Sequence, residues 1–348
     1  MRKTFLLVVF VLLSLLILSA CQIEDADEIP GKGMAAEISS VAATQSAFNN
    51  QQNIIEELVK TNTPTVTPTP VEDEEDSLDE IDFDCTETFC SWSWPGWIER
   101  PIGLGNTRTI DISYPYASTG EGAFEIHHGV EFLNPNSTPV LAAQDGEVIF
   151  ADYDATPDIG PYWGFYGYVV ILRHPDLVID EQVVYTLYAH LSGISVAVGD
   201  QVTTGDVLGE VGFSGVAVGP HLHFEVRVGI NNYDHTVNPI LWFAPLDETD
   251  HPSSAMLAGQ ILGPSGFPVT ELPLTLEHLT ADGTVQAIHY PKTYYAGRVN
   301  AHPLLEENFA VSDLPAGDYR LTFVYVRLYE IHFTLEPGAL GFIRIQLD

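Results

Sequence analysis

Short apolar runs separated by Gly, Pro, Asn and Asp fill the chain from residue 107 to residue 245. They have the length and the β-branched and aromatic content of strands, and no long run with a 3.6-residue period interrupts them. The expected strands are Thr109–Ser113, Val140–Ala143, Glu147–Ala151, Tyr168–Leu172, Val183–Ala189 and Val207–Val211. The pattern predicts one domain over residues 107–245, built from antiparallel strands.

The last hundred residues carry a second set of short apolar runs. These are Gly259–Gly263, Pro273–Glu277, Phe309–Val311, Leu314–Leu321 and a final run near Phe342–Leu347. A spacing of this kind, with about seven strands, is typical of a small β-sandwich, which we expect at residues 255–348. The predicted fold class is therefore all-β: an antiparallel β-sheet domain followed by a small C-terminal β-sandwich.

The first residues have the features of an export signal. Arg2 and Lys3 precede an apolar run, Phe5–Leu18, which is too short to span a bilayer comfortably and ends in LSAC. This ending resembles a bacterial lipobox, which implies a signal peptide over residues 1–20 and lipidation of Cys21. An uncleaved anchor or an ordinary signal peptide is the alternative. In each case the working protein lies outside the cytoplasm.

Residues 21–84 have the composition of a stalk. A short helix is expected between residues 34 and 60, followed by the Thr/Pro-rich linker Thr61–Pro70 and the acidic run Glu72–Asp84. Residues 85–106 then form a segment rich in Cys and Trp. In an exported chain Cys85 and Cys90 are expected to form a disulfide rather than a thiolate metal site.

The charge balance excludes some partners. The chain has 13 basic and 48 acidic residues, a formal net charge of −35. Nucleic acid is therefore not an expected partner, and an acidic surface is repelled by anionic lipid. Membrane attachment should come from the lipid on Cys21, while a hydrophobic content of 45% allows real cores in both folded domains. The sequence gives no prediction of the oligomeric state.

Candidate chemistry centres on the stretch GPHLHFEVRVG, from Gly219 to Gly229. On a strand, His221 and His223 point to the same side, while Leu222 faces the other way. Two histidines in this pattern can present a metal site or simply form a polar face. The remaining ligands must come from elsewhere in the chain.

Two further segments offer such residues. His127 and Glu131 lie four apart in FEIHHGVEF, and Gly129 between them permits a backbone bend that brings both to one ion. With one of the two later histidines they would form a His-His-carboxylate set with one open position, as in catalytic zinc sites. His190, at a predicted strand-to-loop junction, is either a surface histidine or a group for proton transfer or oxyanion stabilisation.

The segment from His127 to Arg227 resembles the lysostaphin/LytM-type zinc metallopeptidases, bacterial enzymes that hydrolyse peptide cross-links in peptidoglycan. The resemblance rests on HHGVEF (family pattern H-x-G-x-D), PVLAAQDGEVIFA, YGYVVILRH, YTLYAHLSGISVAVGDQVTTGDVLGEVGFSG, GPHLHFEVR and VNP. In addition, LPAGDYRL resembles the prealbumin-like, carboxypeptidase regulatory-like sandwich modules. The second resemblance implies a role in spacing or in binding the wall.

Carried over residue by residue, the first resemblance implies that His127, Glu131 and His223 bind one Zn²⁺. It makes His221 the general base, and it makes His190 the group that assists the oxyanion and moves protons. The family has aspartate where this chain has Glu131, which is one methylene longer. We expect a backbone shift or a changed binding mode to absorb this arm, with a loss of metal affinity or activity.

The resulting prediction is a lipid-anchored zinc endopeptidase at the cell surface that acts on peptidoglycan peptides. One alternative is a non-catalytic wall-binding or hydrolase-activating protein that uses the same cleft. Another is a purely structural surface protein, in which the histidines have no role in any wall phenotype.

Overall fold

The computed structural model describes residues 88–155, 159–246, 254–295, 297 and 299–348. The predicted signal peptide, the lipidation site Cys21, the stalk with its short helix, and Cys85 lie outside the described residues. Every residue described below lies within the unit Asp76–Asp348. No helix within the described residues is both long and apolar enough to span a bilayer.

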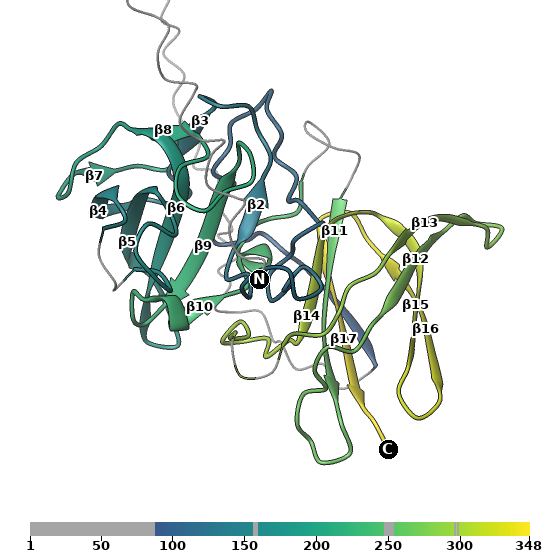
Figure 1. The fold of residues 1–348 in the computed structure, drawn as a ribbon. Helices are drawn as coiled ribbons and strands as arrows, with labels where there is room; N and C mark the ends of the chain where they lie inside the picture. Colours follow the sequence, from purple (N-terminus) through teal and green to yellow (C-terminus); the bar gives the residue numbers. More distant parts are fainter. Residues whose placement is uncertain (1–87, 156–158, 247–253, 296, 298) are drawn as a thin grey trace, which may run out of the picture. The chain divides into compact units, whose positions relative to one another are not determined.

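A nine-stranded antiparallel sheet is built from residues 130–237 (Figure 1). Its strands are β2 (Val130–Phe132), β3 (Pro139–Leu141), β4 (Gly146–Tyr153), β5 (Tyr168–Ile179), β6 (Gln182–Ile194), β7 (Gln201–Val202), β8 (Val207–Val211), β9 (Leu222–Val228) and β10 (Thr236–Val237). The main order is β10-β9-β6-β5-β4-β7, with β2 beside β9 and β8 joining β3 to β6. Two short 3₁₀ helices, η2 (Tyr233–His235) and η3 (Pro239–Trp242), follow β9.

Of the six strands expected in this region, four lie within β4, β5, β6 and β8, and the fifth, Val140–Ala143, overlaps β3, which ends at Leu141. The expected strand Thr109–Ser113 is wrong, because these residues form bends and irregular structure. The Asp111 carboxylate accepts hydrogen bonds from the backbone and the hydroxyl of Ser113, and Ile110 N donates to Asp313. Local side-chain partners of this kind compete with strand pairing.

Two four-stranded sheets form the C-terminal β-sandwich. The first has the order β1-β17-β11-β14, from β1 (Phe89–Ser93), β17 (Ala339–Gln346), β11 (Ser254–Leu262) and β14 (Phe309–Pro315). The second has the order β13-β12-β15-β16, from β13 (Val285–His289), β12 (Thr275–Leu279), β15 (Gly317–Val324) and β16 (Leu328–Leu335). Among the described ladders, only β11 and β17 pair in parallel. The predicted all-β class, with antiparallel sheets, is confirmed.

The strand β1 pairs antiparallel with β17, so a segment that precedes the nine-stranded sheet completes the C-terminal one. Trp94 and Trp97, just after β1, pack edge to face at 5.0 Å, and Trp97 lies 5.4 Å from Trp242. These tryptophans are therefore packing residues. Cys90, within β1, is disulfide-bonded, and its pairing with Cys85 stays a prediction.

Alternation along β9 decides which residues enter the core. Leu222, Phe224, Val226 and Val228 are buried in one apolar cluster, which also contains residues of η3 and of the first sandwich sheet. That sheet contributes Met256, Ala258, Leu340 and Phe342 to the cluster. The opposite face of β9 is left for polar side chains.

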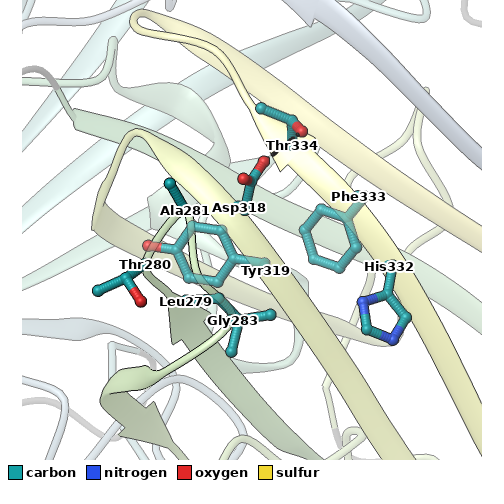
Figure 2. A pocket seen from close by; sticks show the side chains of 9 residues that line it. All are labelled: Leu279, Thr280, Ala281, Gly283, Asp318, Tyr319, His332, Phe333 and Thr334. Atoms are coloured by element: carbon teal, nitrogen blue, oxygen red, sulfur yellow. Dashed lines mark hydrogen bonds between the residues drawn. The ribbon is translucent and has the colours of Figure 1, made fainter.

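An open hollow of about 350 Å³ lies on the second sandwich sheet (Figure 2). Tyr319 and Phe333, both buried, lie beside it, and the Thr334 hydroxyl donates to Asp318 at 2.7 Å. His332 at its edge is paired with Glu330 at 2.8 Å. Because Thr334, Asp318 and His332 already have polar partners, the hollow has no cluster of free ligand atoms among the described residues.

Candidate metal centre and catalytic site

The polar face of β9 carries the centre of the site. His223, Glu225 and Arg227 follow one another at alternate positions of the strand, and His221 directly precedes it. The backbone N–H of His221 donates to the carbonyl of Gly212 at 3.1 Å, which extends the strand geometry by one residue. The alternation expected from H-x-H is therefore present and continues for two more polar residues.

Three side chains converge on one point beside this strand. Glu131 of β2 pairs directly opposite His223 of β9, and His127 comes from the segment just before β2. His127 Nε2 lies 2.9 Å from Glu131 Oε1 and 3.2 Å from His223 Nδ1, and His223 Nδ1 lies 3.0 Å from Glu131 Oε1. In the described part of the chain, this is the single group of three or more His, Cys, Asp or Glu side chains with metal-binding geometry.

The spacing of these three atoms fits a zinc ion. Bonds of about 2.0–2.1 Å in a tetrahedral site separate neighbouring ligand atoms by about 3.3 Å. The observed separations are 2.9, 3.0 and 3.2 Å. Two imidazoles and one carboxylate are also the ligand set of catalytic zinc sites that keep a fourth position open.

The charges in the cluster favour a cation. Burial alone would raise the pKa of the Glu131 carboxyl, but the charges and hydrogen bonds of His223 and His127 hold that pKa well below its usual range. Burial alone would lower the pKa of His223, but Glu131 and Glu225 raise it to about 9. Without metal the cluster keeps an extra proton, and a metal ion would replace that proton.

Glycine is needed at position 129 because neighbouring atoms lie too close for a side chain, and not because the backbone angle is unusual. A Cβ at this position would lie 2.5 Å from the carbonyl oxygen of Phe224 and 2.7–2.8 Å from the His223 ring. The bend anticipated between His127 and Glu131 therefore depends on a residue without a side chain, since any side chain would push against a ligand.

Gly129→Ala is expected to destabilise the fold by about 1–3 kcal/mol and to weaken zinc binding, because the new methyl group must displace β9 or the His223 ring. Thermal unfolding and competition with a chromogenic chelator measure the two effects. Gly193→Ala is the matched control, since its Cβ meets no atom within 4 Å. Equal behaviour of the two variants would contradict this role of Gly129.

His190 and His221 lie beside the three ligand residues. Their ring centroids are 4.8 Å apart, and His221 Nε2 lies 3.1 Å from Glu131 Oε2. His221 Nδ1 is 2.8 Å from the carbonyl of Gly219, and His190 Nδ1 is 2.8 Å from the carbonyl of Ser214. Because a carbonyl can only accept, each Nδ1 carries a proton, and in the neutral form of each ring the lone pair is on Nε2.

The backbone around His190 differs from the expectation. The residue lies inside β6 rather than at its end, with a φ of +60°. Tyr168 pairs with Leu191 and Val170 with Tyr188, so β6 carries one extra residue in this stretch. This is a β-bulge, which re-aims a side chain, and the left-handed angle costs about 1–2 kcal/mol. Burial, with the charges of His223 and His221, lowers the pKa of His190 to about 3.

The longer arm of Glu131 is accommodated without loss of the cluster. Its Oε1 reaches both His127 and His223, while Oε2 extends toward His221. Glu131 pairs directly opposite His223 in the β2–β9 ladder. Its side chain therefore reaches the His223 ring on the neighbouring strand.

Glu131→Asp, which restores the residue of the resembled family, is expected to lower zinc affinity. Removing one methylene withdraws the carboxylate by about 1.5 Å from atoms it now reaches. The zinc dissociation constants of wild type and Glu131→Asp test this prediction. Tighter binding by the aspartate variant would show that the longer glutamate side chain weakens zinc binding.

The structure also separates the other histidines from the site. His128 is buried and turned away, with Nδ1 2.7 Å from Thr236 Oγ1 and its ring stacked on Tyr233 at 3.7 Å. His174 is buried between the carbonyl of Asp145 and the hydroxyl of Thr186. Both are structural residues.

Sequence reasoning missed four residues around the cluster. Tyr114 stacks on His127 with ring centroids 4.2 Å apart. Glu225 Oε1 lies 3.0 Å from His223 Nε2, and Arg227 and Tyr166 bind Glu225. Glu225 and Arg227 could have been found, because they continue the alternation of His221 and His223. Nothing in the local pattern indicated Tyr114 or Tyr166.

Known proteins share part of this chain. The chain is 36% identical over 137 residues to the DD-carboxypeptidase/endopeptidase Mpg of Neisseria meningitidis serogroup B, which covers 39% of the chain and 27% of that protein. It is 34% identical over 117 residues to the peptidoglycan DD-endopeptidase ShyC of Vibrio cholerae, which covers 33% of the chain and 24% of that protein. The chain thus spans about a quarter of the length of these relatives.

Among solved structures, the catalytic domain of lysostaphin from Staphylococcus simulans is similar, with 26% identity, a TM-score of 0.29, and coverage of 43% of this chain and 89% of that domain. The family model described as Peptidase family M23 matches residues 125–239, a stretch that contains all five residues of the candidate site. Residues 125–239 are therefore a domain of Peptidase family M23.

Proposed function

We propose that the protein is a zinc-dependent endopeptidase that hydrolyses peptide bonds in peptidoglycan cross-links or stem peptides. The observation that supports this most strongly is the convergence of His127, Glu131 and His223 on one point, with His221 and His190 beside them. The family of residues 125–239 and the named activities of the relatives Mpg and ShyC support the same substrate class.

His127 Nε2, Glu131 Oε1 and His223 Nδ1 would hold the zinc ion. When bound, the ion polarises the scissile carbonyl and makes water more acidic. The remaining chemistry is proton movement, which falls to the two other histidines. In their neutral forms both rings have an unprotonated Nε2, because each Nδ1 donates to a backbone carbonyl.

His221 is the proposed general base. Its Nε2 lies 3.1 Å from Glu131 Oε2 and is therefore next to the metal position. It would take a proton from the attacking water and return it to the amine that leaves, which is the general acid–base sequence expected of a histidine near neutral pH. Its side chain is also the most exposed of the five, at 13%, against 4–10% for the ligands.

His190 is the proposed second proton carrier. As a neutral ring it accepts a proton on Nε2 rather than donating one to an oxyanion. His190 could stabilise the oxyanion only in its protonated form. Of the two roles expected for His190, we therefore favour proton transfer over stabilisation of the oxyanion by the neutral ring.

The supporting observations favour catalysis over non-catalytic wall binding. A protein that only binds peptides has no need for two histidines whose hydrogen bonds leave basic nitrogens beside a metal site. The predicted export signal and the lipidation site Cys21 add a location to this proposal. They imply a lipoprotein that faces the cell wall.

The test is digestion of defined peptidoglycan fragments by the full chain, with and without a chelator, followed by identification of the newly exposed amino groups. The proposal expects cleavage with zinc, loss on chelation, and recovery when zinc is restored. Stoichiometric zinc without any new amino group would support the non-catalytic alternative.

A further inference from the structure

The ring of His223 is held at both nitrogens. Nδ1 lies 3.0 Å from Glu131 Oε1 on the metal side, and Nε2 lies 3.0 Å from Glu225 Oε1 on the opposite side. A neutral imidazole carries only one N–H. If Nε2–H donates to Glu225, the lone pair of Nδ1 must face the metal position.

Both carboxylate oxygens of Glu225 are bound by neighbouring side chains. Its side chain is fully buried; Oε1 accepts from the hydroxyl of Tyr166 as well as from His223, and Oε2 accepts from Arg227 Nε at 2.8 Å and lies 2.7 Å from Nη2 in an ion pair. A carboxylate with bonds on both oxygens cannot rotate away from His223 without breaking several of them. Its rotamer is therefore fixed.

Arg227 is buried to the same extent, and both of its terminal nitrogens donate further hydrogen bonds. Nη2 donates to the carbonyl of Ile159 at 2.9 Å and to the hydroxyl of Tyr166 at 3.2 Å, and Nη1 donates to Asn231 at 3.2 Å. A buried ion pair is weak evidence for stability, because desolvation offsets the attraction. Its value here is better sought in the geometry that it imposes on Glu225.

Tyr166 connects this network to the other half of the site. Its hydroxyl binds Glu225, and its backbone carbonyl accepts from the N–H of His190 at 2.9 Å, at the residue with positive φ. Its own N–H donates to the buried carboxylate of Asp154 at 3.0 Å. One residue thus contacts both the partner of a metal ligand and the backbone of a catalytic histidine.

We propose that Glu225, fixed by Arg227 and Tyr166, is a positioning residue that sets the tautomer and ring orientation of His223, so that Nδ1 rather than Nε2 binds the metal. The inference rests on the proposed zinc site but extends it to residues that contact neither metal nor substrate. Partners of this kind behind a ligand histidine raise metal affinity by about 10–100-fold.

Two variants of the full chain test the proposal, with zinc alone as the probe. Glu225→Gln keeps the size of the side chain but removes its charge, and Tyr166→Phe removes only the hydroxyl. Tyr188→Phe is the matched control, because this buried tyrosine lies on the neighbouring strand β6 and its hydroxyl contacts only Ala143 N and Thr186 Oγ1. The measurements are the zinc dissociation constant, the midpoint of thermal unfolding, and the ¹⁵N NMR signals of the His223 ring in the zinc-loaded protein.

We expect zinc to bind about 10–100-fold more weakly to Glu225→Gln, and more weakly to Tyr166→Phe by an amount near the lower end of that range. In wild type the ring signals should show Nε2 protonated and Nδ1 bound, and this pattern should weaken or broaden in both variants. Tyr188→Phe should lower the unfolding midpoint about as much as Tyr166→Phe while keeping wild-type zinc affinity and wild-type His223 signals.

Wild-type zinc affinity and unchanged His223 signals in both test variants would overturn the proposal, whatever happens to stability. A wild-type chain that binds zinc but cleaves no peptidoglycan would refute the proposed function and leave this inference standing. A wild-type chain without a zinc site would refute both.

Discussion

His221→Ala is expected to lower kcat for cleavage of a peptidoglycan peptide by about 10²–10⁴-fold, the usual contribution of a positioned acid–base group. The reason is that His221 Nε2, next to the metal position, is the proposed acceptor for the proton of the attacking water. Zinc content should stay at one ion per chain, because His221 is not among the three converging ligands. Steady-state kinetics and metal analysis of the same preparation measure both results.

The control for this variant is His332→Ala. His332 is an exposed histidine of β16 that pairs with Glu330, far from the ligand cluster in sequence and on a different sheet. Its removal should leave kcat unchanged. Undiminished cleavage by His221→Ala, with zinc present, would exclude His221 as the base.

Glu131→Gln is expected to weaken zinc binding by more than about 100-fold, which exceeds the effect typical of a residue behind the ligands. The substitution removes the one anionic ligand, and the Oε1 atom that it changes lies 2.9 Å from His127 Nε2 and 3.0 Å from His223 Nδ1. Cleavage of peptidoglycan fragments should be lost with the metal. Chelator competition and metal analysis give the affinity directly.

Glu121→Gln makes the same chemical change at a surface position, where the carboxylate is 83% exposed and contacts Lys292. It should bind zinc as wild type does. If Glu131→Gln also kept wild-type affinity, the His-Glu-His cluster would be a hydrogen-bonded network and not a metal site.

Much of the candidate cluster could be predicted from the sequence, because four of its residues lie at short spacings within two segments, 127–131 and 221–223. Strand alternation places His221 and His223 on one face, and the β2–β9 register then brings Glu131 opposite His223. The same alternation extends to Glu225 and Arg227. Their position on the polar face of the strand could therefore be predicted, although their role could not.

Other features could not be derived in this way. The bulge at His190 arises from a mismatch between β5 and β6, and a pattern of apolar positions in one strand contains no information on such a mismatch. Tyr166 reaches Glu225 from a connection 59 residues earlier in the chain. Asp111 and Ser113 show the converse case, in which local hydrogen bonds prevented a strand that the apolar pattern favoured.

The pairing of β1 with β17 has a consequence for how this protein could have been assembled. The chain leaves the first sandwich sheet at Ser93 and returns to it at Ser254, with only β17 between the two strands, so exit and return lie about 10 Å apart. The nine-stranded sheet is thus an insertion into the sandwich and not a domain that simply precedes it. Recombination that exchanged the inserted domain for another would need two breakpoints close together in space, and a shuffled gene that kept only residues after 254 would encode a sheet without its edge strand.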